Sequence, residues 1–209
     1  MSLTVITGPM FSGKSTELIR QIRRAQIAEA QMQLFKYAQD ARYADAQELA
    51  SYDGHTITAV TALNTHEVIK KMRPEAHFVV FDEIQFFDDI NIDYVCHLVE
   101  EGRRVMCAGL NLDFRGEPFP FVGGGRRTMA DLLVRADFIV KLSGVCTDRD
   151  GRGIRCGAEA TRTQRLVDEN PANYHDPIKM IGSQESYEAR CVKHHAVPGR
   201  VCSLEIKNT

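Results

Sequence analysis

The segment from Thr4 to Thr16, TVITGPMFSGKST, constrains the fold of this chain more than any other. Apolar and β-branched residues run directly into Gly8, and a Gly-x-x-x-x-Gly-Lys-Ser pattern then ends at Ser15. Good helix formers follow to about Ala30, so the segment predicts a strand, a tight turn and a helix. In this order, the turn favours phosphate binding through its backbone N–H groups and the helix N-terminus.

The side chains of this loop suit a nucleotide phosphate. Lys14 can reach the β- and γ-phosphates, and the Ser15 hydroxyl can ligate Mg²⁺. An ordinary glycine-rich turn is the alternative interpretation, since many unrelated chains match the pattern. The loop residues expected to contact a nucleotide are Gly8, Pro9, Met10, Phe11, Ser12, Gly13, Lys14, Ser15 and Thr16.

Strand-like and helix-like segments alternate as far as Leu142. The run HFVVFDE, 77–83, is almost continuously apolar, as expected of a strand covered on both faces. The alternation predicts an α/β fold of the P-loop, RecA-like type, with a parallel sheet flanked by helices. The expected strands are 2–7, 32–38, 55–60, 77–83, 103–110 and 137–142, and the expected helices are 15–30, 64–72, 90–101 and 126–136.

The pattern changes after Leu142, where Gly, Arg, Asp and Cys become frequent. We expect two domains: residues 1–143 as the nucleotide-binding domain, and 144–209 as a small β-rich lobe held by a metal. Four of the six cysteines lie in this second region. The other two, Cys96 and Cys107, lie in apolar surroundings and are expected to be core thiols.

Composition excludes several classes of function. The 209 residues are 44% hydrophobic and carry a net charge of −2, with acidic and basic residues interspersed. No basic face for nucleic acid is expected, and no apolar run approaches the ~20 residues of a membrane span. The N-terminus lacks the charged region of a signal peptide, so we expect a cytoplasmic protein without disulfides.

Two carboxylates end the apolar strand at 77–83. Asp82 is the candidate to hold the Mg²⁺ shell beside the phosphate loop. Glu83 then remains for another task, although it could simply cap the next turn.

Apolar and aromatic residues follow the strands near these carboxylates. Phe86 comes just after Glu83, and GLNLDFRGEPFPF adds Leu110, Phe114 and Phe119 in a loop after the next strand. Ligands of open α/β sheets bind at this edge, and such side chains suit a flat heteroaromatic substrate. This favours a kinase over a motor ATPase, and a hydrophobic cluster beneath a long loop is the alternative.

Five segments occur together in the order GPMFSGKST, DARY, FDEIQFF, GLNLDF…PF and YEARCVKH. In this order they resemble the type II thymidine kinases over about Val5 to Pro198. The resemblance implies transfer of the γ-phosphate of ATP to the 5′-hydroxyl of thymidine, giving thymidine monophosphate. It also implies a homotetramer that is inhibited by thymidine triphosphate.

The resemblance also implies roles for individual residues. Glu83 matches the catalytic base, Asp82 and Ser15 match the magnesium-side residues, and Lys14 matches the phosphate-loop lysine. Asp40 and Arg42 match a segment near the phosphates. Met10, Phe86, Leu110, Phe114 and Phe119 match the base pocket, and Thr163, Ile178, Met180 and Tyr187 match a loop that closes over thymidine.

A structural zinc ion is also implied, held by Cys146, Cys156, Cys191 and His194. The chain departs from the family here, because nine residues, 147–155, separate the first two cysteines where two are usual. Zinc requires four donors in a tetrahedron and no fixed loop length, so the site remains feasible. His195 could replace His194, Cys202 is a spare thiol, and loss of the metal is the alternative.

Two rival functions remain on sequence grounds. One is a nucleic-acid-dependent ATPase with a zinc knuckle, which the near-neutral charge disfavours. The other is a nucleotide-binding regulator without catalysis, which the intact Lys14, Ser15, Asp82 and Glu83 disfavour.

Overall fold

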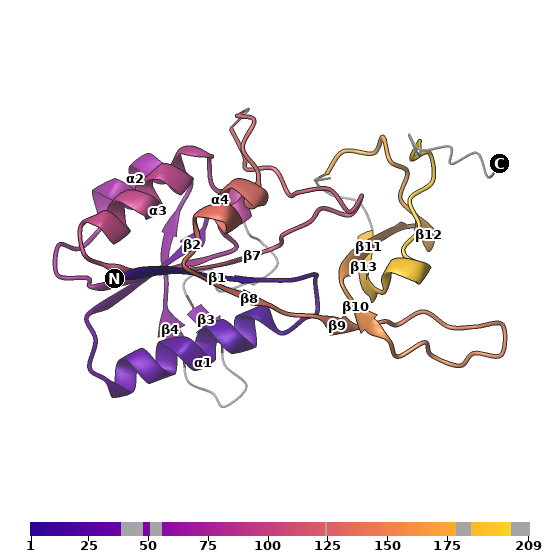
Figure 1. Ribbon diagram of the computed structural model, residues 1–209, viewed down its shortest axis with the longest axis horizontal. Coiled ribbons are helices and arrows are strands. Elements are labelled where there is room, and N and C mark those ends of the chain that lie inside the picture. The colour runs from indigo at the N-terminus through magenta and orange to yellow at the C-terminus, as the bar shows by residue number, and fades with distance from the viewer. Residues whose placement is uncertain (39–47, 51–55, 124, 179–184, 202–209) are drawn as a thin grey trace, which may run out of the picture.

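A six-stranded parallel sheet forms the centre of the larger lobe in the computed structural model of the protein (Figure 1). The structure describes residues 1–38, 48–50, 56–123, 125–178 and 185–201. The strand order is β5-β2-β6-β7-β1-β8, which confirms the predicted parallel α/β class. The strands are β1 (Ser2–Thr7), β2 (Met32–Tyr37), β5 (Val60–Ala62), β6 (Phe78–Asp82), β7 (Arg104–Gly109) and β8 (Phe138–Lys141).

Helices cover both faces of this sheet. Figure 1 shows α1 (Lys14–Ile27) on one side, and α2 (Thr65–Lys71), α3 (Ile90–Glu100) and α4 (Met129–Arg135) on the other. Every residue of β6 is buried. Because successive side chains of a strand point to opposite faces, Phe78 and Val80 join the core beneath α1, and Val79 and Phe81 join the core on the other side.

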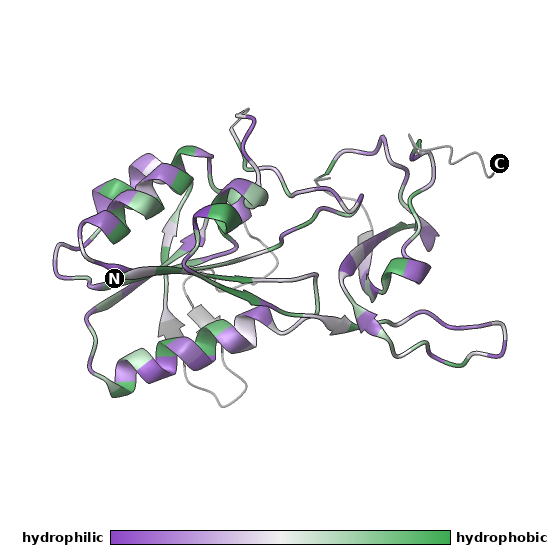
Figure 2. Ribbon diagram, in the orientation of Figure 1, coloured by the Kyte–Doolittle hydropathy of each residue, from purple (hydrophilic) through white to green (hydrophobic). Residues whose placement is uncertain are grey.

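The sequence of α1 explains how it docks. Leu18, Ile22 and Ala25 recur at helical spacing and are buried against the sheet. Figure 2 shows hydrophobic and hydrophilic residues interleaved along this helix, as expected when one face is buried and the other is in solvent. The sheet and α1 therefore fix the direction in which the phosphate loop leaves β1.

Two predicted strands differ from the structure. The segment 55–60 divides into β4 (Thr56–Thr58), which pairs antiparallel with β3 (Glu48–Ala50), and the start of β5, which joins the main sheet. The run 137–142 is an edge strand and not a core strand, since Phe138 is 62% and Ile139 50% exposed. An apolar run fits either position, and only the path of the chain beside β1 places it at the edge.

The small lobe contains two antiparallel sheets beside the larger lobe (Figure 1). One sheet pairs β9 with β10, and the other has the order β12-β11-β13. A single 3-10 turn, η2 (Val192–His194), follows the last strand. The strands are β9 (Gly144–Val145), β10 (Glu159–Ala160), β11 (Arg162–Val167), β12 (Asn170–Pro171) and β13 (Glu185–Arg190).

Within the described ranges, none of the helices combines the length and apolar character needed to cross a membrane. The two expected core thiols differ in burial: Cys107 is buried, whereas Cys96 is only partly so. Burial raises the pKa of the Cys107 thiol well above its ordinary value.

A capping box starts α4 and gives a direct test of the fold. The Thr128 hydroxyl accepts a hydrogen bond from the Ala130 N–H at 3.2 Å, and the Asp131 carboxylate accepts one from the Thr128 N–H at 2.7 Å. Thr128→Ala should lower the free energy of unfolding by about 1 kcal/mol in urea titrations. Thr128→Ser keeps the hydroxyl and should stay within a few tenths of wild type, so equal losses in both variants would contradict this account.

Candidate active site

Glycine is required at both ends of the loop between β1 and α1. Gly8 has φ +151°, and a Cβ there would lie 2.4 Å from the Leu142 carbonyl oxygen. Gly13 has φ +83° and immediately precedes the first turn of α1. Because glycine has no side chain, no side-chain cap occupies this end of α1, and the N-terminus of a helix favours an anionic ligand.

The loop is closed over its own backbone. The Pro9 carbonyl oxygen accepts hydrogen bonds from the Ser12 hydroxyl and from the Lys14 ammonium, each at 2.8 Å. The Lys14 side chain therefore folds back over the loop, while Ser15 and Thr16 are exposed at the start of the helix. This geometry keeps the lysine charge where a phosphate in the loop would meet it.

The chain turns sharply where β6 ends. Asp82 is only 7% exposed, and its carboxylate accepts a hydrogen bond from the Glu83 N–H at 3.1 Å. Glu83 has φ +50° and ψ +46°, the left-handed region that non-glycine residues rarely adopt. This turn leads into the 3-10 turn η1 (Ile84–Phe86) and frees the two acidic side chains from the alternation of the strand.

Gln85 is a buried polar residue that sequence reasoning missed. Its side-chain N–H donates to the Glu83 carboxylate at 2.5 Å, and its amide oxygen accepts from the Leu110 N–H at 3.2 Å. A polar residue between the apolar Ile84 and Phe86 was the available signal in the sequence. Gln85 thus joins the acidic end of β6 to the loop that follows β7.

The phosphate loop and the acidic turn lie at the same edge of the sheet. β1 and β6 are both parallel to β7, which lies between them, so the carboxyl ends of all three strands meet there. The Thr7 hydroxyl donates to the Gly109 carbonyl oxygen at 2.9 Å and ties the end of β1 to the end of β7.

Most of the predicted pocket residues join a single apolar cluster. The Phe86 and Phe119 rings meet edge to face, with centroids 5.9 Å apart. Phe114 lies apart from this cluster, with the guanidinium groups of Arg165 and Arg115 over its ring at 5.2 and 5.4 Å. This cluster is the hydrophobic core on the α2, α3 and α4 side of the sheet: Leu110 and Phe119 belong to it, and Met10, Phe86 and Ile178 pack against it.

The small lobe touches the phosphate loop directly. The Met10 N–H donates to the hydroxyl of Thr163, a buried residue of β11, at 3.0 Å.

The small lobe also contacts the loop after β7 through His195. His195 Nε2 lies 2.8 Å from the Phe114 carbonyl oxygen, so this nitrogen carries the hydrogen. Burial lowers the pKa of His195, which is consistent with a neutral ring.

A cavity of about 760 Å³ opens between the phosphate loop and the small lobe. Phe11 lines it on the loop side, and Tyr187 of β13 lines it on the lobe side. Tyr187, which was matched to the loop that closes over thymidine, lines this cavity, whereas Phe86, Leu110 and Phe119, which were matched to the base pocket, do not.

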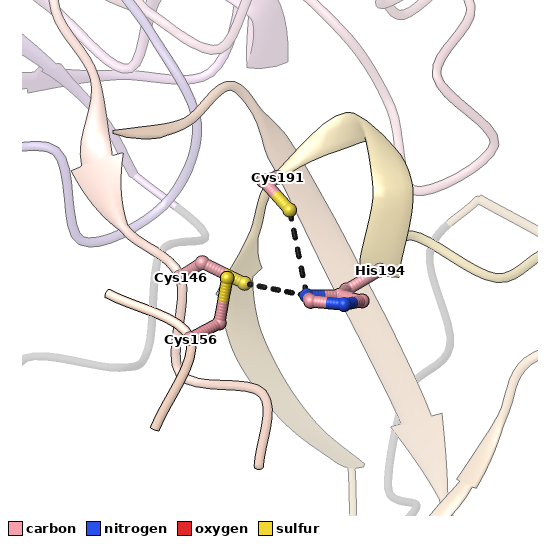
Figure 3. Close-up of side chains that lie close together, drawn as sticks. All are labelled: Cys146, Cys156, Cys191 and His194. Carbon is pink, nitrogen blue, oxygen red and sulfur yellow. Dashed lines mark hydrogen bonds between the residues drawn. The ribbon is translucent and has the colours of Figure 1, made fainter. Parts of the chain in front are cut away.

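The four predicted metal ligands come together, as Figure 3 shows. Their donor atoms all lie within 4.8 Å of one another. His194 Nδ1 is 3.5 Å from the Cys191 sulfur and 3.7 Å from the Cys146 sulfur. Zinc bond lengths of about 2.3 Å to sulfur and about 2.1 Å to nitrogen require donor separations of roughly this size, so the donor set fits zinc.

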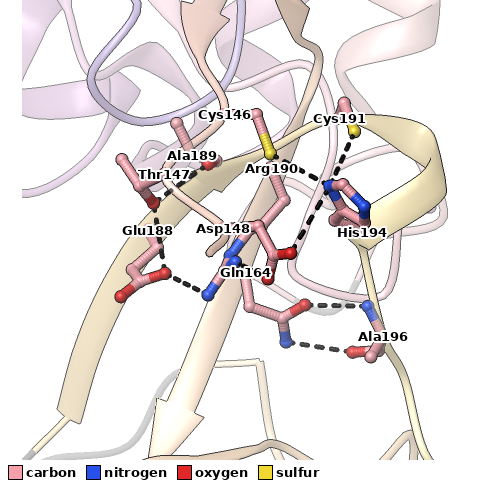
Figure 4. Close-up of polar contacts among 10 residues, drawn as sticks. All are labelled: Cys146, Thr147, Asp148, Gln164, Glu188, Ala189, Arg190, Cys191, His194 and Ala196. Carbon is pink, nitrogen blue, oxygen red and sulfur yellow. Dashed lines mark hydrogen bonds and ion pairs between the residues drawn. The ribbon is translucent and has the colours of Figure 1, made fainter. Parts of the chain in front are cut away.

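The insert at 147–155 explains how Cys156 returns to Cys146. It forms an antiparallel excursion with a bridge between Arg149 and Arg155. At its base the Cys156 N–H donates to the Asp148 carbonyl oxygen at 2.7 Å. Figure 4 shows Asp148 and Glu188 both paired with Arg190, which fixes the base of the excursion to β13.

Backbone contacts favour the thiolate form of two of these cysteines. Burial opposes ionisation of Cys146 and Cys191, but hydrogen bonds from backbone N–H groups, together with side chains of the cluster, lower the pKa of both thiols. For Cys146 these N–H groups belong to Cys191 and Asp148. Thiolate is the form that binds metal.

Four residues named in the sequence analysis lie outside the described residues: Asp40, Arg42, Met180 and Cys202.

A parallel α/β sheet whose glycine-rich loop leads from a strand into a helix is the architecture of P-loop nucleotide-binding proteins. The family model described as thymidine kinase matches residues 1–195, and the chain therefore belongs to the thymidine kinase family. The chain is accordingly an ATP-dependent kinase.

The strained glycine at the start of the loop yields a test. Gly8→Ala should weaken ATP binding at least about tenfold, because a Cβ there must displace the Leu142 carbonyl and distort the loop. Isothermal titration with ATP measures this. Gly151→Ala is the matched control, since a Cβ at Gly151 meets no atom within 4 Å. Unchanged affinity in Gly8→Ala would contradict the assignment of the loop.

Proposed function

We propose that this chain transfers the γ-phosphate of ATP to the 5′-hydroxyl of thymidine, with Glu83 as the general base. The main support is the Glu83 carboxylate, which the left-handed turn and Gln85 hold at the same sheet edge as the phosphate loop. A base in this position can approach an acceptor hydroxyl that faces a phosphate in the loop. Membership in the thymidine kinase family supports the substrate pair.

The phosphate loop is proposed to hold the triphosphate. Backbone N–H groups and the N-terminus of α1 bind the phosphate oxygens, and Lys14 exchanges its bond to Pro9 for one to the β- or γ-phosphate. The Ser15 hydroxyl and the Asp82 carboxylate are the oxygen ligands proposed for Mg²⁺, which neutralises phosphate charge when bound. Asp40 and Arg42 are proposed to lie near the same phosphates.

Glu83 is proposed to accept the hydroxyl proton as the new P–O bond forms. A carboxylate is a weak base toward an alcohol, so its contribution comes late in transfer, when the oxygen is already losing electron density to phosphorus. Positioning of the two substrates contributes most of the rate enhancement. Apolar side chains around the acceptor exclude water and so limit hydrolysis of ATP.

The thymine base is proposed to bind among the apolar residues near this edge. The edge-to-face contact of Phe86 with Phe119 supports a wall suited to a flat ring. Thr163 supports coupling of this pocket to the phosphate loop through its bond to Met10. The proposed pocket comprises Met10, Phe86, Leu110, Phe114, Phe119, Thr163, Ile178, Met180 and Tyr187.

The zinc ion is proposed to be structural, bound by Cys146, Cys156, Cys191 and His194. All four positions of a tetrahedron are then filled by protein, which leaves no site for substrate. We further propose the division into a domain of residues 1–143 and a lobe of residues 144–209. The metal would fix the ends of the segment that covers the base.

The family resemblance extends the proposal to a cytoplasmic homotetramer inhibited by thymidine triphosphate. Exposed apolar side chains on the edge strand β8, Phe138 and Ile139, support contact with another copy of the chain. The net charge of −2 disfavours the rival, a nucleic-acid-dependent ATPase. That rival predicts ATP hydrolysis stimulated by DNA or RNA, with no transfer to a nucleoside.

The role of Glu83 can be tested with Glu83→Gln. The amide cannot take a proton, so turnover with thymidine should fall by about 10²–10⁴-fold, while ATP affinity stays near that of wild type. Transfer from labelled ATP to thymidine measures the rate. Glu75→Gln removes an exposed carboxylate elsewhere and should leave turnover unchanged. Near-normal turnover in Glu83→Gln would exclude this residue as the base.

Metal content tests the zinc site. Wild-type protein should keep about one zinc ion per chain after dialysis, and Cys146→Ser should lose it and unfold at a lower temperature. Cys96→Ser is the matched control, because Cys96 lies in α3 and outside the cluster. A folded, active wild-type protein without zinc would rule the site out.

A further inference from the structure

We propose that Gln85 is a positioning residue that holds the Glu83 carboxylate in its catalytic orientation and couples it to the loop after β7, which begins at Leu110. This inference rests on the proposed role of Glu83 as the base. Gln85 is fully buried, with 0% of its surface exposed. A buried side-chain amide must find hydrogen-bond partners, and here both of its ends do so at the candidate active site.

The orientation of the Gln85 amide follows from its partners. The Leu110 backbone N–H can only donate, so it must face the amide oxygen, which lies 3.2 Å away. The amide nitrogen is therefore the end that lies 2.5 Å from Glu83 Oε2. Donation to Oε2 leaves Oε1 as the oxygen available to receive the acceptor proton.

Tight packing restrains this amide. A Cβ built on Gly109 would lie 2.4 Å from the Gln85 amide oxygen, 3.2 Å from Ile84 and 3.3 Å from Met129. The end of β7 thus approaches Gln85 so closely that only glycine fits beside it. The Gln85 amide has no room to move toward β7, so its hydrogen bond to Glu83 Oε2 restrains the Glu83 side chain.

The two hydrogen bonds of Gln85 connect the proposed base, Glu83, to the loop that carries predicted base-pocket residues. Leu110 begins the loop that carries the predicted base-pocket residues Phe114 and Phe119, and Glu83 lies in the turn after β6. One side chain therefore sets the distance between the base and the wall of the acceptor pocket. Since a carboxylate displaced by about 1 Å can lose much of its rate contribution, this restraint should affect the chemical step more than binding.

The central test is Gln85→Met, which keeps the approximate size of the side chain and removes both hydrogen bonds. Turnover should fall by about 10–100-fold, as for other residues that orient a functional group. The KM values for thymidine and ATP should stay within about threefold of wild type, because Gln85 is fully buried and exposes no surface to a substrate. A rise in KM with unchanged kcat would overturn the proposal.

A double-variant cycle separates positioning from stability. In the Glu83→Gln background there is no base left to orient, so adding Gln85→Met should lower the residual turnover by no more than about twofold. Single-turnover transfer from labelled ATP is sensitive enough for both variants. A further tenfold loss in the double variant would show that Gln85 acts independently of Glu83 and would overturn the proposal.

Gln33 offers a matched control for loss of a buried amide. It is 3% exposed, donates to the Lys71 carbonyl oxygen at 2.8 Å and accepts from the Arg73 N–H at 2.8 Å. It lies near the amino end of β2, whereas the candidate active site lies at the carboxyl ends of the strands. Gln33→Met should lower the melting temperature about as much as Gln85→Met does and leave kcat unchanged.

Gly109→Ala moves Gln85 without replacing it and provides a second variant. The new methyl group must push the amide away from β7, so kcat should fall while the protein remains folded.

Failure of this inference is distinct from failure of the proposed function. An inactive Glu83→Gln with a fully active Gln85→Met overturns only the role of Gln85, whereas an active Glu83→Gln overturns both.

Discussion

The structure depends on burial of both faces of a parallel sheet. Most residues of β1 and β7 and every residue of β6 are buried, so the positions of these strands leave little freedom for the turns that follow. The carboxyl ends of these parallel strands lie together, and the glycine-rich loop, the acidic turn and the loop that begins at Leu110 follow β1, β6 and β7 there. The candidate site is thus a consequence of core packing, with polar groups gathered where three buried strands come to an end.

The packing at the carboxyl ends of the strands stabilises backbone conformations that are locally strained. The left-handed backbone of Glu83 costs about 1–2 kcal/mol, and the bonds to Asp82 and Gln85 help to hold it. Gly8 and Gly109 allow close contacts near the same strand ends. A Cβ at Gly8 would clash with the Leu142 carbonyl, and one at Gly109 would clash with the Gln85 amide. Rigid strands therefore let short loops keep conformations that would be unfavourable in isolation.

The small lobe reaches the same edge through a few polar contacts. The Thr163 hydroxyl accepts a hydrogen bond from Met10 in the glycine-rich loop, and His195 bonds to the backbone of the loop after β7 at Phe114. His195 directly follows His194, so a single residue links the Cys/His cluster to the loop after β7. Order in the lobe should therefore be transmitted to the loops that surround the candidate site.

The sequence by itself determined the fold class, the glycine-rich loop, the acidic strand end and the three clustered cysteines, because each rests on local patterns or on linked motifs. Tertiary structure alone decided the hydrogen bonds of Gln85 to Glu83 and Leu110, the edge position of β8 and the place of His194 in the cluster, with His195 bonded to Phe114 instead. The insert also needed the fold, since its antiparallel pairing is what returns Cys156 to Cys146. Local patterns show which segments are apolar or reactive, but contacts between residues far apart in the chain depend on how the strands are ordered.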